Sequence, residues 1–538
     1  MTKQDHRLRQ LQTHGMNWAV DAAFEDTLRE VVIPNLGSLE SAGAAPVKRT
    51  LTRTVHRLEF AGRAVFIKHH VVRSIKERLK YLVLPSRAAA EWRTSLGMAA
   101  RGLPAPRCLA LGERRVAGVL REAVLVSEAV DGALPFSRAL EDDRTLLSRA
   151  ARMIRSMHDA DVLHRDLHGG NILVRGTELT FIDLHRASVG RPVSRSRRIR
   201  SVAQFLAAVT PLLGHGDVRQ FVCEYLGPDA TANEADRFSR AVETRITGLR
   251  DLRCASRTRR CVKESTGFRI ESSGGLRVHR RAEFAAEHVQ LAIRRHNETI
   301  AAGRAGAVLK CDNRTRVSVV DPGVDGMPVL CVKESTRPGI LQRLGDIFIG
   351  SPAMRAWVGA NGLLVRGIPT PRPLAIAEAG RRSYIITEYV GDSDTLDRCI
   401  VARRGPERGE PVRKWRGLIE AAAGFVRLVH SHRLRHRDLK AKNILVREKD
   451  DSPEFYLVDT GDVRFGRKPS LAYKIKNLVQ LDCLVHPPSR TDRLRFYRHY
   501  AAGDAKLCRR DVPAEIAVTS RAKYRRWLER RNRLERQK

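Results

Sequence analysis

One stretch occurs twice in the chain: residues 164–174 read HRDLHGGNILV and residues 436–446 read HRDLKAKNILV. In each copy an Asp stands five residues before an Asn: Asp166 and Asn171, Asp438 and Asn443. An apolar run and a second Asp follow each copy: Asp183 in FIDLHR, Asp459 in LVDTGDV. The same order in both halves argues against a chance match and predicts a shared chemistry.

These residue types suit phosphoryl transfer, which depends on positioning and charge neutralisation. In phosphotransferase catalytic loops the first Asp accepts the proton of the attacking hydroxyl, and the Asn and the later Asp hold magnesium. Mg²⁺ prefers carboxylate, carbonyl and water oxygens. We therefore expect Asp166 and Asp438 to be the catalytic bases, with ATP and Mg²⁺ as cofactors. The expected metal ligands are Asn171, Asp183, Asn443 and Asp459.

A lysine precedes each catalytic loop. A predicted strand within residues 47–70 ends in Lys68, and the strand VLCVKES carries Lys333 265 residues later. The same separation relates RGLPAPR at 101–107 to RGIPTPR at 366–372. The constant spacing predicts that both lysines contact the nucleotide phosphates, as the strand lysine of kinase-like folds does.

The two halves differ at the partner of this lysine. Glu91, in the predicted helix RAAAEWRTSLGMAARG, is expected to pair with Lys68 and orient it. The aligned residue of the second half is Ala356, so Lys333 lacks a carboxylate there. Since a misplaced lysine stabilises the transition state less, we expect the first half to be the more robust catalyst.

Neither half has a glycine-rich phosphate loop. The corresponding strand-turn segments, 48–55 and 310–317, are basic and contain Thr, so they could hold phosphate through side chains. Glu128 in LVSEAV and Glu388 in ITEYV mark the hinge segments whose backbone is expected to meet the adenine of ATP. There the identity of the side chain matters little.

The composition favours polyanionic partners. The chain has 538 residues, with 98 Lys and Arg against 60 Asp and Glu, a formal net charge of +38. Aromatic residues make up 5%, and no nucleic-acid-binding motif is recognised, so no specific nucleic acid is expected. The nine cysteines form no CxxC pair and indicate reduced thiols. The N-terminal residues do not resemble a signal peptide, and we expect a cytoplasmic protein.

The repeated order predicts two tandem bilobal protein-kinase-like domains of the α+β class, each binding nucleotide between a strand-rich and a helical lobe. The expected domains are residues 1–252 and residues 253–538, the latter with a basic C-terminal tail. After Asp183 the basic stretch 191–200 is expected to precede a helix beginning near Val202. The tail at 521–538 is expected to be a helix that packs one apolar stripe on the second domain.

Both halves resemble the lipopolysaccharide kinases, the Kdo and core-heptose kinases of the protein-kinase-like superfamily. The lysine strands, the helix with AEW or RAW, the RGxPxPR turn and HRDLxxxNILV carry this resemblance over about residues 45–230 and 300–500. It implies transfer of phosphate from ATP to a Kdo or heptose hydroxyl of the lipopolysaccharide inner core. It further implies an anionic glycolipid acceptor. The net charge of +38, with no apolar run long enough to span a bilayer, favours binding to an anionic membrane surface such as the inner membrane.

Other functions stay open at this point. Lys440 resembles the catalytic-loop lysine of protein Ser/Thr kinases, but no APE motif is present and neither metal Asp precedes Phe-Gly. His168 gives some support to a small-molecule kinase of the aminoglycoside or choline kind. A kinase-shaped protein that only binds is a third possibility, against which the retained Lys68, Asp166 and Asp183 argue.

Overall fold

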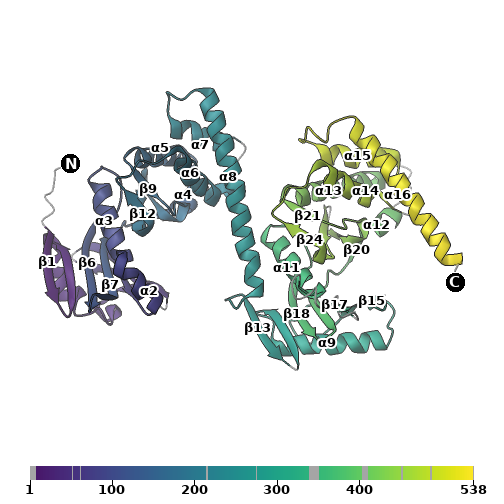
Figure 1. Cartoon of the computed structure of the whole chain (residues 1–538), viewed down its shortest axis with the longest axis horizontal. Helices are drawn as coiled ribbons and strands as arrows, with labels where there is room; N and C mark the ends of the chain where they lie inside the picture. The colour runs from purple at the N-terminus through teal and green to yellow at the C-terminus, as the bar shows by residue number, and fades with distance from the viewer. Residues whose placement is uncertain are drawn as a thin grey trace. The chain divides into compact units, whose positions relative to one another are not determined.

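The computed structural model describes residues 8–50, 52–60, 62–213, 216–273, 275–337, 350–402, 410–449, 452–484 and 488–536. The chain divides into two compact units, Met1–Arg250 and Asp251–Lys538. Each unit joins a seven-stranded antiparallel sheet to a helical part (Figure 1). The predicted fold class is confirmed: the protein is α+β, with two tandem bilobal kinase-like arrangements.

The sheet of the first unit has the order β1-β2-β6-β7-β5-β4-β3. Its strands are β1 (Leu8–Thr13), β2 (Met16–Asp21), β3 (Ala45–Thr50), β4 (Arg53–Phe60), β5 (Arg63–Val71), β6 (Cys108–Val116) and β7 (Val119–Glu128). Because side chains alternate along β5, Val65 and Ile67 enter the core on one face while Lys68 lies on the other. The sequence predicts that this strand ends at Lys68, but it continues three residues further because it stays paired with β4 and β7.

Two helices connect β5 to β6. Helix α2 (Ile75–Val83) begins after Ser74, whose hydroxyl accepts from the Glu77 amide, and this helix was not predicted. Helix α3 (Arg87–Ala99) begins after Ser86, whose hydroxyl caps the Ala89 amide at 2.9 Å. Trp92 of α3 packs with Leu125 of β7, the residue paired with Lys68. Helix α3 therefore covers the face of the sheet that carries the lysine.

The helical part of the first unit packs around a core that includes Ile154, Phe181 and Phe205. Its helices are α4 (Phe136–Asp142), α5 (Leu146–Asp159), α6 (Arg195–Val209), α7 (Asp217–Leu226) and α8 (Ala232–Thr258), which continues past Arg250 into the second unit. Short strands lie between them: β8 (Leu134–Pro135), β9 (Val162–His164), β10 (Ile172–Arg175), β11 (Glu178–Phe181) and β12 (Ala187–Val189). Helix α6 begins at Arg195, so the predicted start near Val202 is wrong. Arginine is a good helix former, and the exposed first turn needs no apolar periodicity.

The second sheet repeats the order of the first, as β13-β14-β18-β19-β17-β16-β15. Its strands are β13 (Phe268–Ser273), β14 (Leu276–Arg281), β15 (Val308–Cys311), β16 (Thr315–Val320), β17 (Leu330–Thr336), β18 (Pro373–Ala379) and β19 (Arg382–Glu388). Helix α9 (Ala286–Ala301) packs on this sheet through Val289 and Ile293. Strand β17 also continues three residues past its lysine, Lys333.

The remaining helices of the second unit are α11 (Pro352–Val365), α12 (Leu396–Ala402), α13 (Glu410–Ser431), α14 (Leu471–Asp482), α15 (Arg490–Ala501) and α16 (Asp511–Arg536). Its short strands are β20 (Ser393–Thr395), β21 (Leu434–His436), β22 (Ile444–Lys449), β23 (Ser452–Leu457) and β24 (Val463–Phe465). The basic tail belongs to α16, where the rings of Tyr524 and Trp527 stack 5.8 Å apart. Over the described residues, no helix combines the length and the apolar character needed to cross a bilayer.

Candidate active site

Asn171 makes one hydrogen bond within the first catalytic loop and one to the segment that leads to Asp183. The Asn171 side-chain amide donates to the Asp166 carbonyl at 2.9 Å, and the Asn171 carbonyl accepts from the Ile182 amide at 3.0 Å. Buried His164 accepts from the Asp166 amide through Nδ1, and its Nε2 lies 3.1 Å from the Ile182 carbonyl. Burial lowers the pKa of His164, so this histidine stays neutral. Its two ring nitrogens connect the loop backbone at Asp166 to the backbone at Ile182. These contacts bring Asp166, Asn171 and Asp183 together.

The second catalytic loop is held by the same contacts. The Asn443 side-chain amide donates to the Asp438 carbonyl at 2.8 Å, and the Asn443 carbonyl accepts from the Val458 amide at 2.9 Å. His436 accepts from the Asp438 amide at 3.3 Å. The repeated sequence thus folds into a repeated hydrogen-bond network, which places Asp459 next to Asn443.

Both metal-binding candidates have an unusual backbone. Asp183 has φ of 58° and Asp459 has φ of 57°, in the left-handed region that few residues other than glycine adopt. Such a conformation costs on the order of 1–3 kcal/mol and is concentrated at functional sites. It turns each aspartate out of the strand that precedes it.

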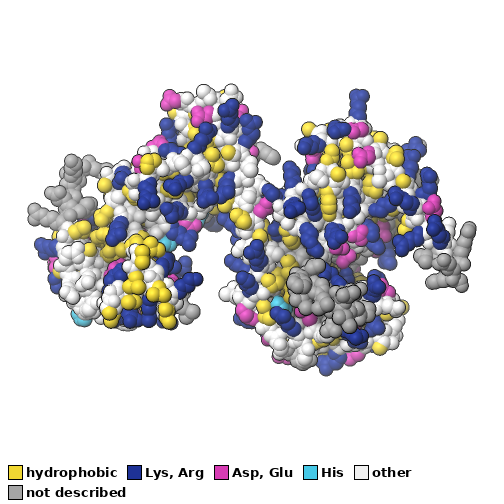
Figure 2. All heavy atoms as spheres, viewed as in Figure 1, with side chains coloured by type: hydrophobic (Ala, Val, Ile, Leu, Met, Phe, Trp, Pro, Cys, Tyr) yellow, Lys and Arg dark blue, Asp and Glu magenta, His cyan; other side chains and the backbone are white. Residues whose placement is uncertain are grey.

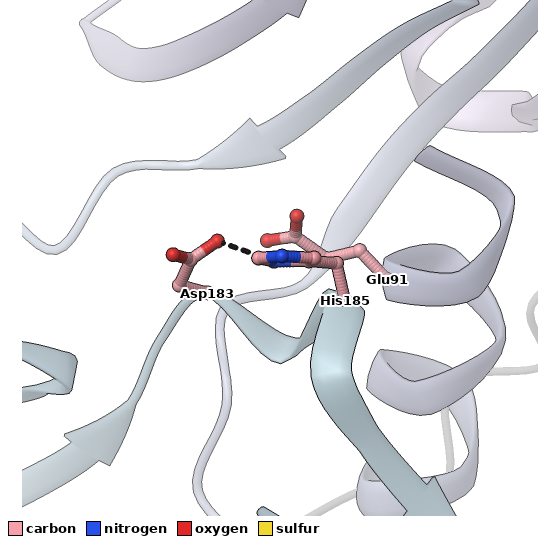
Figure 3. A group of neighbouring side chains, drawn as sticks. All are labelled: Glu91, Asp183 and His185. Carbon is pink, nitrogen blue, oxygen red and sulfur yellow. Dashed lines mark hydrogen bonds and ion pairs between the residues drawn. The ribbon is translucent and has the colours of Figure 1, made fainter. Parts of the chain in front are cut away.

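The arrangement fits a magnesium ion. Because the nitrogen of each asparagine amide is bonded to the loop, the Oδ1 atoms of Asn171 and Asn443 are left as the ligand atoms. Each pairs with a carboxylate, Asp183 or Asp459, and this oxygen donor set is the kind that Mg²⁺ prefers. A further group of possible ligand atoms lies within 4.8 Å of one another: Glu91, Asp183 and His185 (Figure 3).

The predicted partner of Lys68 is the observed one. Lys68 Nζ lies 2.5 Å from Glu91 Oε1, and both side chains are largely buried. His185 Nδ1 lies 2.8 Å from Asp183 Oδ1, and Figure 3 shows the Glu91 carboxylate close to both side chains. Hydrogen bonding by His185, and then the charges of Lys68 and Arg53, hold the pKa of Asp183 well below its usual range. Asp183 is therefore ionised at neutral pH, as a metal ligand must be.

The second unit arranges its lysine differently. Lys333 Nζ contacts the metal-binding candidate Asp459 itself at 2.9 Å. Helix α11 has Ala356 where α3 has Glu91, and the Ala356 carbonyl accepts from the Thr460 hydroxyl at 2.8 Å. A Cβ at Gly359 would lie 2.1 Å from the Thr460 carbonyl oxygen, so this helix approaches the loop closely. Burial opposes ionisation of Asp459, but the Lys333 charge outweighs it and the pKa is lowered.

The two candidate bases also have different neighbours. The Asp166 carboxylate accepts from Gln204 at 3.3 Å and from Arg186 at 3.4 Å. The Asp438 carboxylate instead contacts Lys440 Nζ at 2.8 Å. Sequence analysis missed Gln204 and Arg186, because no motif marks a residue that comes close only through the packing of α6 and the turn after β11.

The predicted hinge glutamates lie away from these clusters. Glu128 ends β7 and Glu388 ends β19. In both sheets the glutamate is three residue positions along the strand from the residue paired with the lysine. Glu388 pairs with Arg372 at 2.9 Å. Neither side chain contacts the lysine and aspartate groups. Contact of the hinge backbone with the adenine of ATP therefore stays a prediction.

A hollow of about 600 Å³ borders the second catalytic loop. Lys440 and Lys442 of the loop line one part, and Tyr524 and Trp527 of α16 line another. Asp397 of α12 also lines the hollow, and its Oδ1 is buried without a hydrogen-bond partner among the described residues. Cations, an aromatic pair and an unsatisfied acceptor thus surround a space next to Asp438.

Comparisons with known proteins point to one family. The model of the lipopolysaccharide kinase (Kdo/WaaP) family matches residues 40–221 and 351–500, which together make up more than half of the chain. Each matched segment contains one HRD loop and the aspartate that follows it, Asp183 or Asp459.

Individual relatives carry related names. The lipopolysaccharide core heptose(I) kinase WaaP of Escherichia coli K12 is 26% identical over 199 residues, covering 33% of this chain and 75% of the relative. The 3-deoxy-D-manno-octulosonic acid kinase of Mannheimia succiniciproducens is 25% identical over 126 residues, covering 22% and 48%. A solved structure of WaaP in complex with acyl carrier protein aligns with a TM-score of 0.32 at 22% identity, covering 42% of this chain and 98% of that one.

Proposed function

Because the chain belongs to the lipopolysaccharide kinase (Kdo/WaaP) family and is therefore a kinase, we propose that it phosphorylates a sugar hydroxyl of the lipopolysaccharide inner core. The donor is the γ-phosphate of ATP and the acceptor sugar is a Kdo or a heptose. The reaction takes place in the cytoplasm at the inner membrane, with the protein bound peripherally. Residues 1–252 and 253–538 are proposed as the two kinase domains.

The observation that carries this proposal is the doubled Asp–Asn–Asp network. In each unit one asparagine is bonded both to the carbonyl of the candidate base and to the residue before the metal-binding aspartate. A protein that only bound nucleotide would not need a base held at a fixed position relative to a metal site. The network supports catalysis by both units.

In the proposed reaction the carboxylates of Asp166 and Asp438 accept the proton of the sugar hydroxyl as it attacks. Asn171 with Asp183, and Asn443 with Asp459, would hold the magnesium ion, which neutralises phosphate charge when bound. Lys68 and Lys333 would contact the nucleotide phosphates. Glu91 is a positioning residue, since it acts through Lys68. The strand ends at Glu128 and Glu388 would meet the adenine through their backbone.

The hollow beside the second loop is where we place the acceptor of the second domain. Lys440 and Lys442 offer positive charge to a carboxylate or a phosphate on the sugar. The Tyr524 and Trp527 rings offer an apolar face to a sugar ring. An inner core bearing acidic sugars matches this lining.

The test is transfer of radioactive γ-phosphate from ATP to purified lipid A-core by the full chain. Asp166→Asn combined with Asp438→Asn should abolish transfer while circular dichroism shows unchanged folding. A histone, a peptide mixture and an aminoglycoside serve as competing acceptors. Transfer to one of those but not to lipid A-core, or wild-type transfer by the double variant, would refute the proposal.

A further inference from the structure

We propose that helix α2, with the arginine-lined hollow beside it, is the surface by which this protein docks on an anionic lipid bilayer. This deepens the proposed function, on which it rests for the expectation that the acceptor is a lipid. The surface belongs to the first unit alone and lies outside the catalytic groups described above.

The apolar part of this surface is exposed to an unusual degree. The exposed fractions are 72% for Ile75, 62% for Leu79, 53% for Leu82, 87% for Val83 and 50% for Leu84. Residues at positions i, i+4 and i+7 or i+8 of a helix share one face, so four of them form a single ridge. Exposed aliphatic side chains gathered this way mark interaction sites in soluble proteins.

The opposite side of α2 explains why the ridge points outward. Tyr81 is the buried residue of this helix, and it packs with Val72 and Leu120 in a small cluster of its own. One aromatic anchor therefore holds the helix on the sheet and leaves the ridge uncovered. Figure 2 shows the apolar patch of α2 with dark blue basic side chains beside it.

The surroundings of the ridge are basic. Lys76, Arg78 and Lys80 lie on α2, and Glu77 is its acidic residue. Beside the helix is a hollow of about 560 Å³ whose lining is arginine and valine: Val71, Val72, Arg73, Arg78, Arg114, Val116 and Arg121. Arg114 pairs with Glu122, while Arg78 donates to the Val72 carbonyl at 3.5 Å. Guanidinium groups in such a hollow match the phosphates of lipid head groups.

An aliphatic ridge with a basic rim has the chemistry of a helix that lies in the membrane interface. The net charge of +38 draws the whole chain toward an anionic surface. A second copy of the chain is a poorer occupant, because like charges would repel. A nine-residue helix about 14 Å long also offers little of the roughly 800 Å² per partner that a stable protein interface buries.

The sequence of the second half contains the same apolar spacing 265 residues later, at Ile340, Leu344 and Ile347. These residues lie outside the described part of the chain and are not included in the proposed surface. The recurrence nevertheless indicates that the pattern is not an accident of one exposed helix.

The experiment is co-sedimentation of the full chain with vesicles of phosphatidylethanolamine and phosphatidylglycerol, and with neutral phosphatidylcholine vesicles. The apolar variant is Leu79→Gln with Val83→Gln, and the charge variant is Lys76→Gln with Lys80→Gln. The matched apolar control is Leu252→Gln with Val518→Gln, whose side chains are similarly exposed, at 68% and 66%. Arg138→Gln with Arg175→Gln is the charge control, since both residues are exposed and lie outside the catalytic groups.

We expect the wild type and both controls to bind anionic vesicles and the apolar variant to bind about tenfold or more weakly. The charge variant should lose roughly tenfold at about 0.1 M salt. All variants should keep wild-type transfer to detergent-dispersed acceptor. If no form transfers phosphate, the proposed function fails while the vesicle result still decides the docking surface.

Anionic-vesicle binding that is unchanged in the apolar variant would overturn the assignment, and so would equal wild-type binding to neutral vesicles. Sedimentation velocity adds one more decisive outcome. A wild-type dimer that the apolar variant converts to monomer would assign the ridge to a second copy of this chain.

Discussion

Lys68 and Lys333 occupy equivalent strand positions and contact different carboxylates. Lys68 pairs with Glu91 of α3, which leaves Asp183 to the imidazole of His185. Lys333 has no carboxylate on α11 and pairs with Asp459 directly. In the first unit Lys68 and Asp183 have separate partners. In the second unit they neutralise one another.

Small residues of the second unit line the contact between α11 and the loop after Asp459. Gly359 lets α11 touch the backbone of Thr460, and Gly461 stands where the first unit has His185. The position aligned with Gly359 in α3 is Thr94, a side chain that such a close approach would not admit. In α3 the position aligned with Ala356 is Glu91, which reaches Lys68. In the second unit α11 has no carboxylate at this position, and the Ala356 carbonyl accepts a hydrogen bond from the Thr460 hydroxyl.

The largest expected effect is the loss of turnover when each candidate base, Asp166 or Asp438, is replaced. Asp166→Asn should remove most of the turnover, Asp438→Asn should remove the smaller part, and the double variant should lose about 10³-fold or more. The reason is that the first unit keeps a lysine already paired with its positioning carboxylate. Initial rates of γ-phosphate transfer for the three variants decide the order. The ranking is wrong if Asp438→Asn alone removes most of the turnover.

A second experiment tests the glutamate itself. In the Asp438→Asn background only the first unit can turn over, and Glu91→Gln should lower kcat there about 10²-fold, since one preorganised charge contact is lost. Glu141→Gln is the control, because Glu141 is an exposed residue paired with Arg138 on α4. A Glu91→Gln rate within about twofold of the control would show that the ion pair is dispensable, whatever its geometry.

The close approach of α11 predicts a difference in stability. Gly359→Ala places a methyl group against the Thr460 carbonyl and should cost about 1–3 kcal/mol in the free energy of unfolding of the second unit. Gly417→Ala on α13 is the matched control. A Cβ there has open space, so this change should stabilise the helix by about 0.5–1 kcal/mol. Urea denaturation of the full chain measures both, and equal effects would contradict the close contact.

The smallest effect concerns a feature that the halves share. His158 bonds Tyr225 and Ser201, and His430 bonds Tyr500 and Asn477. Burial lowers the pKa of His158 to about 3 and that of His430 to about 4, against 6.5 for an ordinary histidine. The unfolded chain therefore binds more protons than the folded one between these values and pH 6.5. Stability present above pH 6.5 is lost as the pH falls.

Each histidine should contribute a slope of up to about 1.4 kcal/mol per pH unit between pH 6.5 and 5. His158→Gln and His430→Gln should each flatten the dependence of the urea midpoint on pH by a similar amount. A slope that either variant leaves unchanged would mean that the histidine is protonated in the folded state.

The grouping of Asp166, Asn171 and Asp183, and of Asp438, Asn443 and Asp459, could be predicted from the spacing of the repeated motif. Lys68 and Glu91 form the expected ion pair, since a lysine on a strand and a glutamate on the helix covering that face can meet in few ways. The contact between Lys333 and Asp459 was not foreseen, because it depends on how close α11 lies to a loop more than 100 residues away. Helix α2 was not predicted, although Ile75, Leu79 and Val83 have helical spacing; the structure shows that this apolar stripe faces outward, which the sequence pattern does not determine.

The left-handed backbone of Asp183 and Asp459 limits how far mutation can stabilise these loops without loss of activity. At both positions glycine would relieve the conformational strain and make the loop more stable, yet it would delete the carboxylate. Selection for thermostability therefore favours glycine at these two positions, and selection for turnover favours aspartate. A screen that rewards folding alone should enrich glycine at 183 and 459, whereas a screen for phosphate transfer should retain aspartate.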